Sequence, residues 1–370
     1  LICRDYYVGT FKGLCLIILG STGSIGVNTI EVAKKFNLNV EVLVAGNNIE
    51  RLNAQIKEVN PSMVVIANKE DVHKVNHPHV AFGQEAILDA IENSTSQTVV
   101  NSLVGFLGLK PTLKAIQCGK KIALANKESL VVAGEFIDQS RLMPVDSEHF
   151  GLWYLLQNKA IASMTITASG GSFRDYPLEK LKNVTVKEAL NHPNWSMGNK
   201  ITIDSATMTN KLFELLEAKW LFNTTHLDAI IETKSLIHAL VNFKDGSTTA
   251  HIANACMQLP IAYAIKQKVD IEVLKPVNLL EVGILEFKKI EVERYPIWEI
   301  KDYMLKNPHL GVVLNAANEV SVSQFLKNKI AFLEISKKTL AALEKFDTVH
   351  PKNLDEIFEI DKEVRAYCGA

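Results

Sequence analysis

Residues 14–26, with the sequence LCLIILGSTGSIG, decide the fold of the N-terminal part of the chain. Residues 14–20 form a continuous apolar run, which is typical of a short strand buried on both faces of a sheet. A glycine-rich turn follows at once, and residues 27–36 have the pattern of an amphipathic helix. Such a turn directs backbone N–H groups and a helix N-terminus at a pyrophosphate. The spacing is G-x-x-G-x-x-G and not the stricter G-x-G-x-x-G. A tight loop without a ligand is therefore the alternative, and we favour nucleotide binding.

Strand-like runs alternate with helical segments as far as about residue 145. Residues 110–117 predict a helix, and Gly119 is well suited to end it. This rhythm predicts an α/β fold with a Rossmann-like, doubly wound parallel sheet. Its further predicted strands are residues 40–46, 63–66, 98–103 and 122–125.

The middle of the chain has a different pattern, which predicts an α+β domain. Residues 164–168 predict a strand, and Thr185 and Glu188 have the spacing of a capping box. Residues 200–204 also predict a strand, with Ser205 as N-cap of a helix that reaches about residue 221. Asp245-Gly246 lies between two strand-like runs and predicts a hairpin.

From about residue 295 the pattern becomes helical, with helices predicted at 314–326 and 332–346 and a short tail after them. We therefore expect a nucleotide-binding domain, a catalytic α+β domain and a C-terminal helical domain. The expected boundaries are a leader at 1–13, then 14–146, 147–268, a linker at 269–294, and 295–370.

Composition excludes several classes of protein. The 370 residues include 40 Lys+Arg and 41 Asp+Glu, so the chain lacks the broad basic field of a nucleic-acid binder. No apolar run approaches the roughly 18 residues of a membrane helix. The five cysteines are far apart and odd in number, so we expect no disulfide framework and a cytoplasmic location. Residues 1–13 lack an initiating Met and an apolar signal core, and we interpret them as a leader of uncertain order.

The densest polar cluster is Asp146-Ser147-Glu148-His149. In an extended segment, residues two apart share a face, so Asp146 and Glu148 would point into one site. Two carboxylates with open coordination positions suit Mg²⁺ or Mn²⁺. The alternative is a solvated loop that caps a helix. Lys127 follows a predicted strand at its carboxyl end, where open α/β sheets bind ligands.

Asn210, Lys211 and Glu214 lie three or four residues apart on one predicted helix, so their side chains can converge. Glu214 would complete the metal site, while Asn210 and Lys211 would hold a phosphate together with Ser205. An ordinary surface ion pair is the alternative. The apolar neighbours of these residues favour a buried helix instead.

Three further segments offer ligand contacts. Ser169-Gly170-Gly171 follows a strand and offers a hydroxyl and backbone donors to an anion. Residues 192–198, HPNWSMG, form a loop that we expect to close over a substrate with Trp195, although loop packing is an equal alternative. After the second strand, Gly46-Asn47-Asn48 has no carboxylate and Arg51 is close, which favours NADP over NAD. A neutral turn without meaning for the cofactor is the alternative.

These motifs resemble the 1-deoxy-D-xylulose 5-phosphate reductoisomerase family from residue 14 onward. The resemblance implies NADPH and a divalent metal as cofactors, a sugar phosphate substrate, and a homodimer without nucleic-acid or membrane partners. It implies rearrangement and reduction of 1-deoxy-D-xylulose 5-phosphate to 2-C-methyl-D-erythritol 4-phosphate in non-mevalonate isoprenoid synthesis. The motifs are GSTGSIG (20–26), LANKESLV (124–131), MPVDSEH (143–149), SGG (169–171), HPNWSMG (192–198), DSATMTNK (204–211) and NAANE (315–319).

The resemblance also implies residue roles. Its metal ligands fall on Asp146, Glu148 and Glu214. Its catalytic set is those three with Lys127, His149 and His192. Its substrate contacts fall on Lys127, Ser147, Glu148, Ser169, His192, Trp195, Ser205, Asn210, Lys211 and Glu214. Its NADPH contacts fall on Thr22, Gly23, Ser24, Ile25, Gly46, Asn47, Asn48, Asn126, Glu128 and Gly198.

Some assignments stay open at this point. The general base is Lys127, Glu148 or a bound water. The family often has Lys where this chain has Asn47, which weakens the charge argument for NADP. A metal-independent NADP-dependent dehydrogenase of the semialdehyde or homoserine type is one alternative function. A dinucleotide-sensing regulator is another.

Overall fold

The computed structural model describes residues 14–156 and 159–369, so the predicted leader at 1–13 lies outside the described residues. The contacts divide the chain into two compact units. The first unit ends its main part at Asn126 and also contains residues 138–147 and 256–274. The second unit contains residues 127–137, 148–255 and those from Lys275 on. The finer division into three domains stays a prediction.

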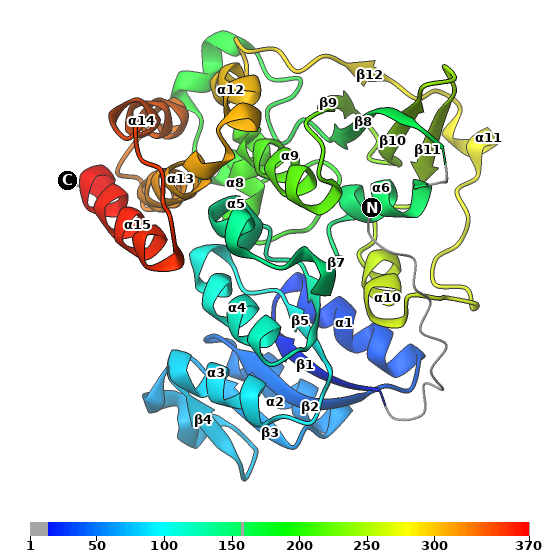
Figure 1. Cartoon of the computed structure of the whole chain (residues 1–370), viewed down its shortest axis with the longest axis vertical. Coiled ribbons are helices and arrows are strands. Elements are labelled where there is room, and N and C mark those ends of the chain that lie inside the picture. The colour runs from blue at the N-terminus through cyan, green and yellow to red at the C-terminus, as the bar shows by residue number, and fades with distance from the viewer. Residues whose placement is uncertain (1–13, 157–158, 370) are drawn as a thin grey trace. The chain divides into compact units, whose positions relative to one another are not determined.

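The first unit is built on a seven-stranded sheet in which all neighbouring strands are parallel (Figure 1). The strand order is β4-β3-β2-β1-β5-β6-β7, which confirms the doubly wound topology. The strands are β1 (Cys15–Leu19), β2 (Asn39–Ala45), β3 (Met63–Ile66), β4 (Val80–Phe82), β5 (Thr98–Asn101), β6 (Lys121–Leu124) and β7 (Leu142–Pro144). The helices are α1 (Ser24–Lys35), α2 (Ile49–Val59), α3 (Gly83–Asn93), α4 (Leu109–Gln117) and α10 (Gln258–Lys266).

The glycine turn lies at the point where the strand order reverses, because β1 pairs with β2 on one side and β5 on the other. Gly20 has a φ of 82°, in the left-handed region that favours glycine. A Cβ on Gly26 would lie 2.4 Å from the Gly20 carbonyl oxygen, so only glycine lets α1 approach the turn. Gly20 N–H and Ser21 N–H both donate to Val44 O, which holds the turn against the end of β2.

The second unit contains a five-stranded mixed sheet with the order β11-β10-β8-β9-β12. The predicted hairpin is confirmed, since β10 and β11 pair antiparallel around Gly246, whose φ is 87°. The strands are β8 (Ile161–Ala168), β9 (Leu227–Glu232), β10 (Ile237–Phe243), β11 (Thr248–Ile252) and β12 (Phe287–Lys288). The helices are α5 (Glu128–Ala133), α6 (Ser147–Leu155), α7 (Val186–Ala189), α8 (Asn199–Thr207), α9 (Thr209–Phe222), α11 (Leu279–Val282), α12 (Lys301–Lys306), α13 (Gly311–Leu326), α14 (Phe332–Lys345) and α15 (Leu354–Gly369).

Three sequence predictions for the chain after residue 199 are wrong. The segment predicted as a strand at 200–204 belongs to helix α8, and Ser205 lies inside this helix and is not the N-cap of α9. The alternation of Lys200-Ile-Thr-Ile-Asp204 imitates a strand, but Lys200 and Asp204 pair one helical turn apart. The expected short tail is the helix α15, whose residues Ile357 and Val364 are buried.

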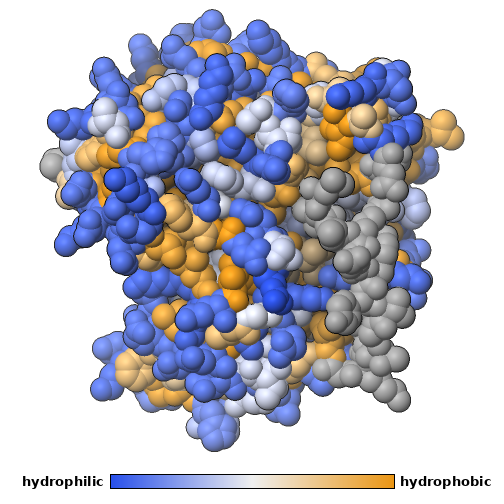
Figure 2. All heavy atoms as spheres, viewed as in Figure 1, coloured by the Kyte–Doolittle hydropathy of each residue, from blue (hydrophilic) through white to orange (hydrophobic). Residues whose placement is uncertain are grey.

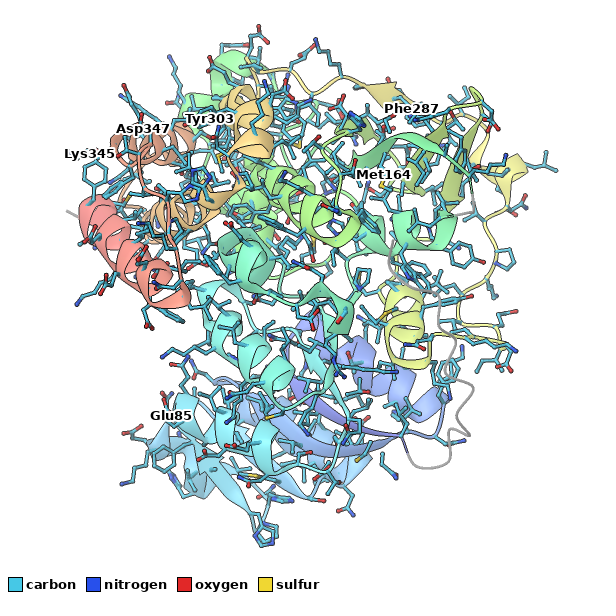
Figure 3. The ribbon with its side chains drawn as sticks, viewed as in Figure 1. Glu85, Met164, Phe287, Tyr303, Lys345 and Asp347 are labelled. Atoms are coloured by element: carbon cyan, nitrogen blue, oxygen red, sulfur yellow. The ribbon has the colours of Figure 1, made fainter. Side chains whose placement is uncertain are left out.

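Hydrophobic side chains are exposed around α11, where Figure 2 shows orange residues at the right-hand edge. Leu280 is 94% exposed and Ile284 is 79% exposed. Phe287, labelled in Figure 3, is 47% exposed on the edge strand β12. Among the described residues, no helix combines the length and the hydrophobicity needed to cross a bilayer.

The close approach at the glycine turn gives a stability prediction. Gly26→Ala should lower the free energy of unfolding by about 1–3 kcal/mol, because the added methyl forces α1 away from the turn. Gly46→Ala is the matched control, since a Cβ there meets nothing within 4 Å. Denaturant unfolding measures both variants. Equal stability of the two would contradict the close packing at Gly26.

Candidate active site

A buried group of lysines and carboxylates forms the centre of the second unit. Lys127 directly precedes α5, and Asn210, Lys211 and Glu214 lie on α9. Lys127 Nζ donates to Asn210 Oδ1 at 3.0 Å and to Glu214 Oε1 at 2.9 Å. Asn210 Nδ2 also donates to Glu214. The predicted convergence on one buried helix is therefore confirmed, and the surface ion pair is excluded because Lys127 and Glu214 are buried.

A second carboxylate joins this group through Lys211. Its ammonium donates to Glu148 Oε1 at 2.8 Å and also contacts Glu214. Glu148 lies in the first turn of α6, so the prediction of an extended segment at 146–149 is wrong. The solvated loop does not hold either, since Ser147 and His149 are buried. Ser147 begins the same helix.

Asp146 is the residue just before α6 and belongs to the first unit. It is two residues from Glu148 along the chain. Consecutive Cα atoms are about 3.8 Å apart, so the two Cα atoms lie within roughly 7 Å of each other by connectivity alone. The carboxylate of Asp146 therefore lies near that of Glu148 in the chain and is the third of this group.

The donor set fits a hard divalent cation. Glu148 and Glu214 come from different helices, yet both accept from the single ammonium of Lys211. The two carboxylates therefore already share one positive charge. The atoms that these residues offer to a metal are carboxylate oxygens, the ligands that Mg²⁺ and Mn²⁺ prefer.

His149 and Glu217 lie buried next to these carboxylates. The Nε2 atom of His149 is 2.8 Å from the backbone oxygen of Glu214, and its Nδ1 atom is 3.3 Å from Glu217 Oε2. His149 thus holds the backbone of Glu214 and acts on the carboxylate through it. Glu217 was missed by the sequence analysis; its place one turn after Glu214 on a buried helix was the available signal.

Two serines and a histidine form a second polar group in the same unit. Backbone N–H groups of Asn194 and Trp195 donate to His192 Nδ1 at 3.1 and 3.0 Å. Because Nδ1 accepts, the ring proton is on Nε2 and is donated to Ser169 Oγ at 2.8 Å. Gly171 N–H also donates to Ser169 Oγ, at 3.1 Å. The hydroxyl of Ser169 accepts twice and keeps its own hydrogen for a ligand oxygen.

Ser205 joins this group from helix α8. Its Oγ lies 3.4 Å from His192 Nε2. The approach depends on Gly171, which has a φ of 67° and whose Cβ would lie 2.6 Å from the Ser205 carbonyl oxygen. Ser169, His192 and Ser205, which the resemblance implies as substrate contacts, therefore come together in the second unit.

The loop 192–198 has no regular structure and is held at its start. Asn194 Nδ2 donates to Thr233 O at 3.1 Å and to Ser235 Oγ at 2.7 Å. The ring of Trp195 packs edge-on to His238 with the centroids 6.4 Å apart. We call residues 192–198 the flap loop.

The expected nucleotide contacts of the first unit surround the glycine turn. Thr22 to Ile25 form the turn and begin α1, and Arg51 Nη1 donates to Thr22 O at 3.3 Å. Asn48 caps α2, and Asn47 Oδ1 accepts from Asn68. Gly46 directly follows β2.

Two other expected nucleotide contacts have protein partners. Asn126 Nδ2 donates to the backbone oxygens of Leu103 and Gly105, both at 2.8 Å. Glu128, in the second unit with Gly198, accepts from Lys200 at 2.9 Å. The amide of Asn126 therefore shapes the loop after β5, and the carboxylate of Glu128 holds a lysine.

Family sequence models match the chain in three consecutive parts. Residues 16–134 match 1-deoxy-D-xylulose 5-phosphate reductoisomerase, residues 142–222 match its C-terminal domain, and residues 252–367 match a DXP reductoisomerase C-terminal domain. The reductoisomerase of Nautilia profundicola is 59% identical over 95% of this chain and 99% of its own. The chain belongs to the 1-deoxy-D-xylulose 5-phosphate reductoisomerase family. The family member of Wolinella succinogenes is 51% identical, again over 95% of this chain and 99% of its own.

Solved structures of the family have the same fold. A crystal structure of DOX-P reductoisomerase with NADPH, fosmidomycin and magnesium gives a TM-score of 0.90 at 31% identity and covers 96% of this chain and 97% of its own. The Zymomonas mobilis enzyme in complex with NADPH gives 0.86 at 32% identity and covers 96% of this chain and 98% of its own.

The buried histidine of the flap loop gives a pH prediction. Burial and the nearby charge of Arg174 lower the pKa of His192 to about 4, from 6.5. Between pH 6.5 and about 4, His192 is protonated in the unfolded chain but neutral in the folded one. The free energy of unfolding therefore falls as the pH drops through this window. We expect a loss of up to about 2 kcal/mol after solvent screening is allowed for. Protonation of Nδ1 would also remove the acceptor of two backbone N–H groups.

Chemical denaturation between pH 7 and pH 4 measures this dependence. His192→Gln should reduce the slope by the part that His192 contributes, whereas the control His226→Gln, at an exposed residue, should keep the wild-type slope. A His192→Gln curve parallel to wild type would show that His192 does not titrate in this way.

Proposed function

We propose that the protein converts 1-deoxy-D-xylulose 5-phosphate into 2-C-methyl-D-erythritol 4-phosphate with NADPH and a divalent metal. The observation that carries this proposal is the convergence of Lys127, Asn210, Lys211 and two carboxylates in the second unit. A metal-independent dehydrogenase would not need such a group. The names of relatives that cover nearly the whole chain support the same reaction.

Asp146, Glu148 and Glu214 would hold the metal, which supplies Lewis-acid polarisation of the substrate oxygens when bound. Lys127 then keeps its contact with Asn210 and holds a proton next to the reacting end. Lys127 and Glu148 remain the protein candidates for proton transfer, since each has a charged partner within 3 Å.

Ser169, Ser205, Asn210 and Lys211 would bind the phosphate of the substrate, and Ser147 would contact its reacting end. The hydroxyl of Ser169 is oriented for this role by His192. Binding the phosphate away from the reacting carbon atoms fixes the orientation of the substrate. Trp195 on the flap loop would cover the bound substrate and exclude water.

The turn from Thr22 to Ile25 and the loop 46–48 would bind NADPH, which supplies the hydride when bound. Arg51 supports NADPH over NADH, because its guanidinium lies against the turn through Thr22 O. It offers a positive charge where the chain has Asn47 in place of a lysine.

A homodimer and a cytoplasmic location complete the proposal. The apolar group of Leu280, Ile284 and Phe287 supports a second copy of the chain as partner, since large exposed apolar patches are uncommon on monomers. The free thiols of Cys15, Cys118, Cys256 and Cys368 support a reducing compartment.

One assay tests the reaction directly. With 1-deoxy-D-xylulose 5-phosphate and Mn²⁺, the protein should consume NADPH and form 2-C-methyl-D-erythritol 4-phosphate. Removal of the metal by a chelator should abolish turnover, and added Mn²⁺ should restore it. Metal-independent NADPH consumption would favour the plain dehydrogenase instead.

The metal assignment is tested at Glu214. Glu214→Gln removes a charged ligand, so Mn²⁺ affinity should fall roughly 10- to 100-fold and turnover with it. Calorimetric or magnetic-resonance titration of Mn²⁺ measures the affinity without turnover. Glu344→Gln, at an exposed carboxylate of α14, is the matched control. Unchanged Mn²⁺ affinity of Glu214→Gln would refute the assignment.

The dimer is tested at the apolar group. Leu280→Glu with Ile284→Glu should yield a monomer by sedimentation, because two charges would be buried without partners. Tyr303→Glu, at a 45%-exposed residue on α12, should stay dimeric. A dimer in both cases would place the interface elsewhere.

A further inference from the structure

Lys200 is a buried cation to which neither the sequence analysis nor the proposed reaction gives a role. Its ammonium donates to Glu128 Oε1 at 2.9 Å and to Asp204 Oδ2 at 2.8 Å. It also lies 5.2 Å from the ring centroid of Phe213, within the range of a cation–π contact. The Lys200 side chain is 15% exposed, and that of Asp204 only 2%.

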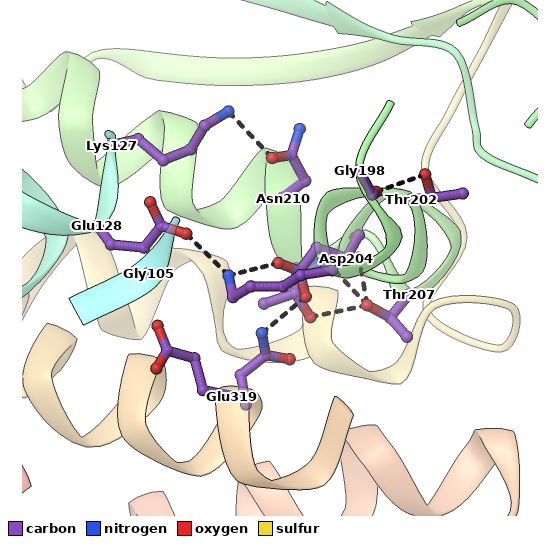
Figure 4. Close-up of polar contacts among 12 residues, drawn as sticks. Gly105, Lys127, Glu128, Gly198, Thr202, Asp204, Thr207, Asn210 and Glu319 are labelled. Carbon is purple, nitrogen blue, oxygen red and sulfur yellow. Dashed lines mark hydrogen bonds and ion pairs between the residues drawn. The ribbon is translucent and has the colours of Figure 1, made fainter. Parts of the chain in front are cut away.

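The second oxygen of Asp204 extends this group to a third helix. Asn318 Nδ2 donates to Asp204 Oδ1 at 2.7 Å, and Asn318 is completely buried. Glu128, Lys200 with Asp204, and Asn318 stand on α5, α8 and α13, respectively. Figure 4 shows the contacts that join these elements. We call Glu128, Lys200, Asp204 and Asn318 the Lys200 cluster.

The Lys200 cluster adjoins the proposed substrate residues along the chain. Glu128 follows Lys127, and Asp204 precedes Ser205. Lys200 stands two residues after Gly198, the end of the flap loop, and Thr202 Oγ1 donates to Gly198 O at 2.9 Å. The cluster therefore fixes the backbone next to two proposed substrate contacts and at the end of the flap loop.

Lys200 and Glu128 each stabilise the charged form of the other. Burial alone would lower the pKa of Lys200, but Asp204 and Glu128 outweigh it and raise the pKa above the ordinary value. Burial would raise the pKa of Glu128, but the charge of Lys200 outweighs it and lowers that pKa. Loss of the lysine charge would leave two carboxylates close together without their shared cation, which is costly.

We propose that Lys200 is a positioning residue, which holds the start of α8 against α5 and α13 and thereby sets the place of Ser205 in the phosphate pocket. The proposal rests on the proposed function, because it takes the phosphate to bind at Ser205, Asn210 and Lys211. A buried salt bridge is weak evidence for stability, so the expected effect lies in ligand geometry.

Lys200→Met tests this role, since it keeps the aliphatic stem and removes the charge. The KM for the substrate and the Kd for inorganic phosphate should rise roughly 10- to 100-fold. Lys200→Arg keeps the charge and should recover most of the phosphate affinity.

Lys301→Met is the matched control. Lys301 also pairs with a carboxylate, Asp228, at 2.9 Å and lies over an aromatic ring, Trp298, at 6.0 Å. This variant removes the same kinds of contact at a site with no proposed ligand. It should keep the wild-type KM and phosphate affinity.

Ser205→Ala separates the failure of this proposal from that of the proposed function. If Ser205→Ala binds phosphate as wild type does, the proposed phosphate pocket itself is refuted. If Ser205→Ala weakens phosphate binding and Lys200→Met does not, the positioning role is overturned. Should Lys200→Met fail to fold, Asn318→Ala removes only the second bond of Asp204 and is measured in its place. A lower melting temperature with unchanged phosphate affinity would then overturn the proposal.

Discussion

The second unit depends on the pairing of buried lysines with buried carboxylates. Lys127 and Lys211 share Glu214, and Lys211 also holds Glu148. An unpaired charge in such a place would cost several kcal/mol, so each group constrains the position of its partners. Because Lys127 directly precedes α5 and the other partners stand on α6 and α9, these ionic contacts constrain the packing of three helices as well as the chemistry of the site. Apolar residues of α9, such as Leu212, Leu215 and Leu216, are completely buried, so the helix that carries Lys211 and Glu214 is shielded from solvent.

This arrangement explains why net charge says little about the ligands. The chain is almost neutral, yet the proposed substrate and cofactor are both anionic. Lys127 and Lys211 are buried beside carboxylates, so in this structure their charge is largely compensated. A divalent metal bound by the carboxylates would pair with them in place of the lysines and leave the ammonium groups to the substrate. The positive field would then arise where the ligand binds and not over the whole surface.

The sequence predicted the parts of the fold that local pattern determines. The turn at 20–26, the parallel sheet and the hairpin at Gly246 follow from apolar periodicity and from glycine conformation, and the structure confirms them. The convergence of Asn210, Lys211 and Glu214 followed from helical spacing. The prediction of a strand at 200–204 was wrong, although apolar and polar residues alternate there. Asp204 pairs with Lys200 and Asn318, and the local pattern does not reveal these contacts. Glu217 was missed for the same reason, since its partner His149 is distant in sequence.

Two of the five points at which the chain passes between its two units fall at proposed site residues. The first crossing falls between Asn126 and Lys127, and another falls between Ser147 and Glu148. At the first crossing, Asn126, whose amide shapes the loop after β5, directly precedes Lys127, which pairs with Glu214. At the other, Asp146 and Glu148 lie on either side of the boundary and yet remain within reach of one cation, because only one residue separates them. Neighbours in the chain at a crossing stay close through any relative motion of the two units. The proposed ligands Asp146 and Glu148 therefore stay near each other by connectivity alone, wherever the two units stand.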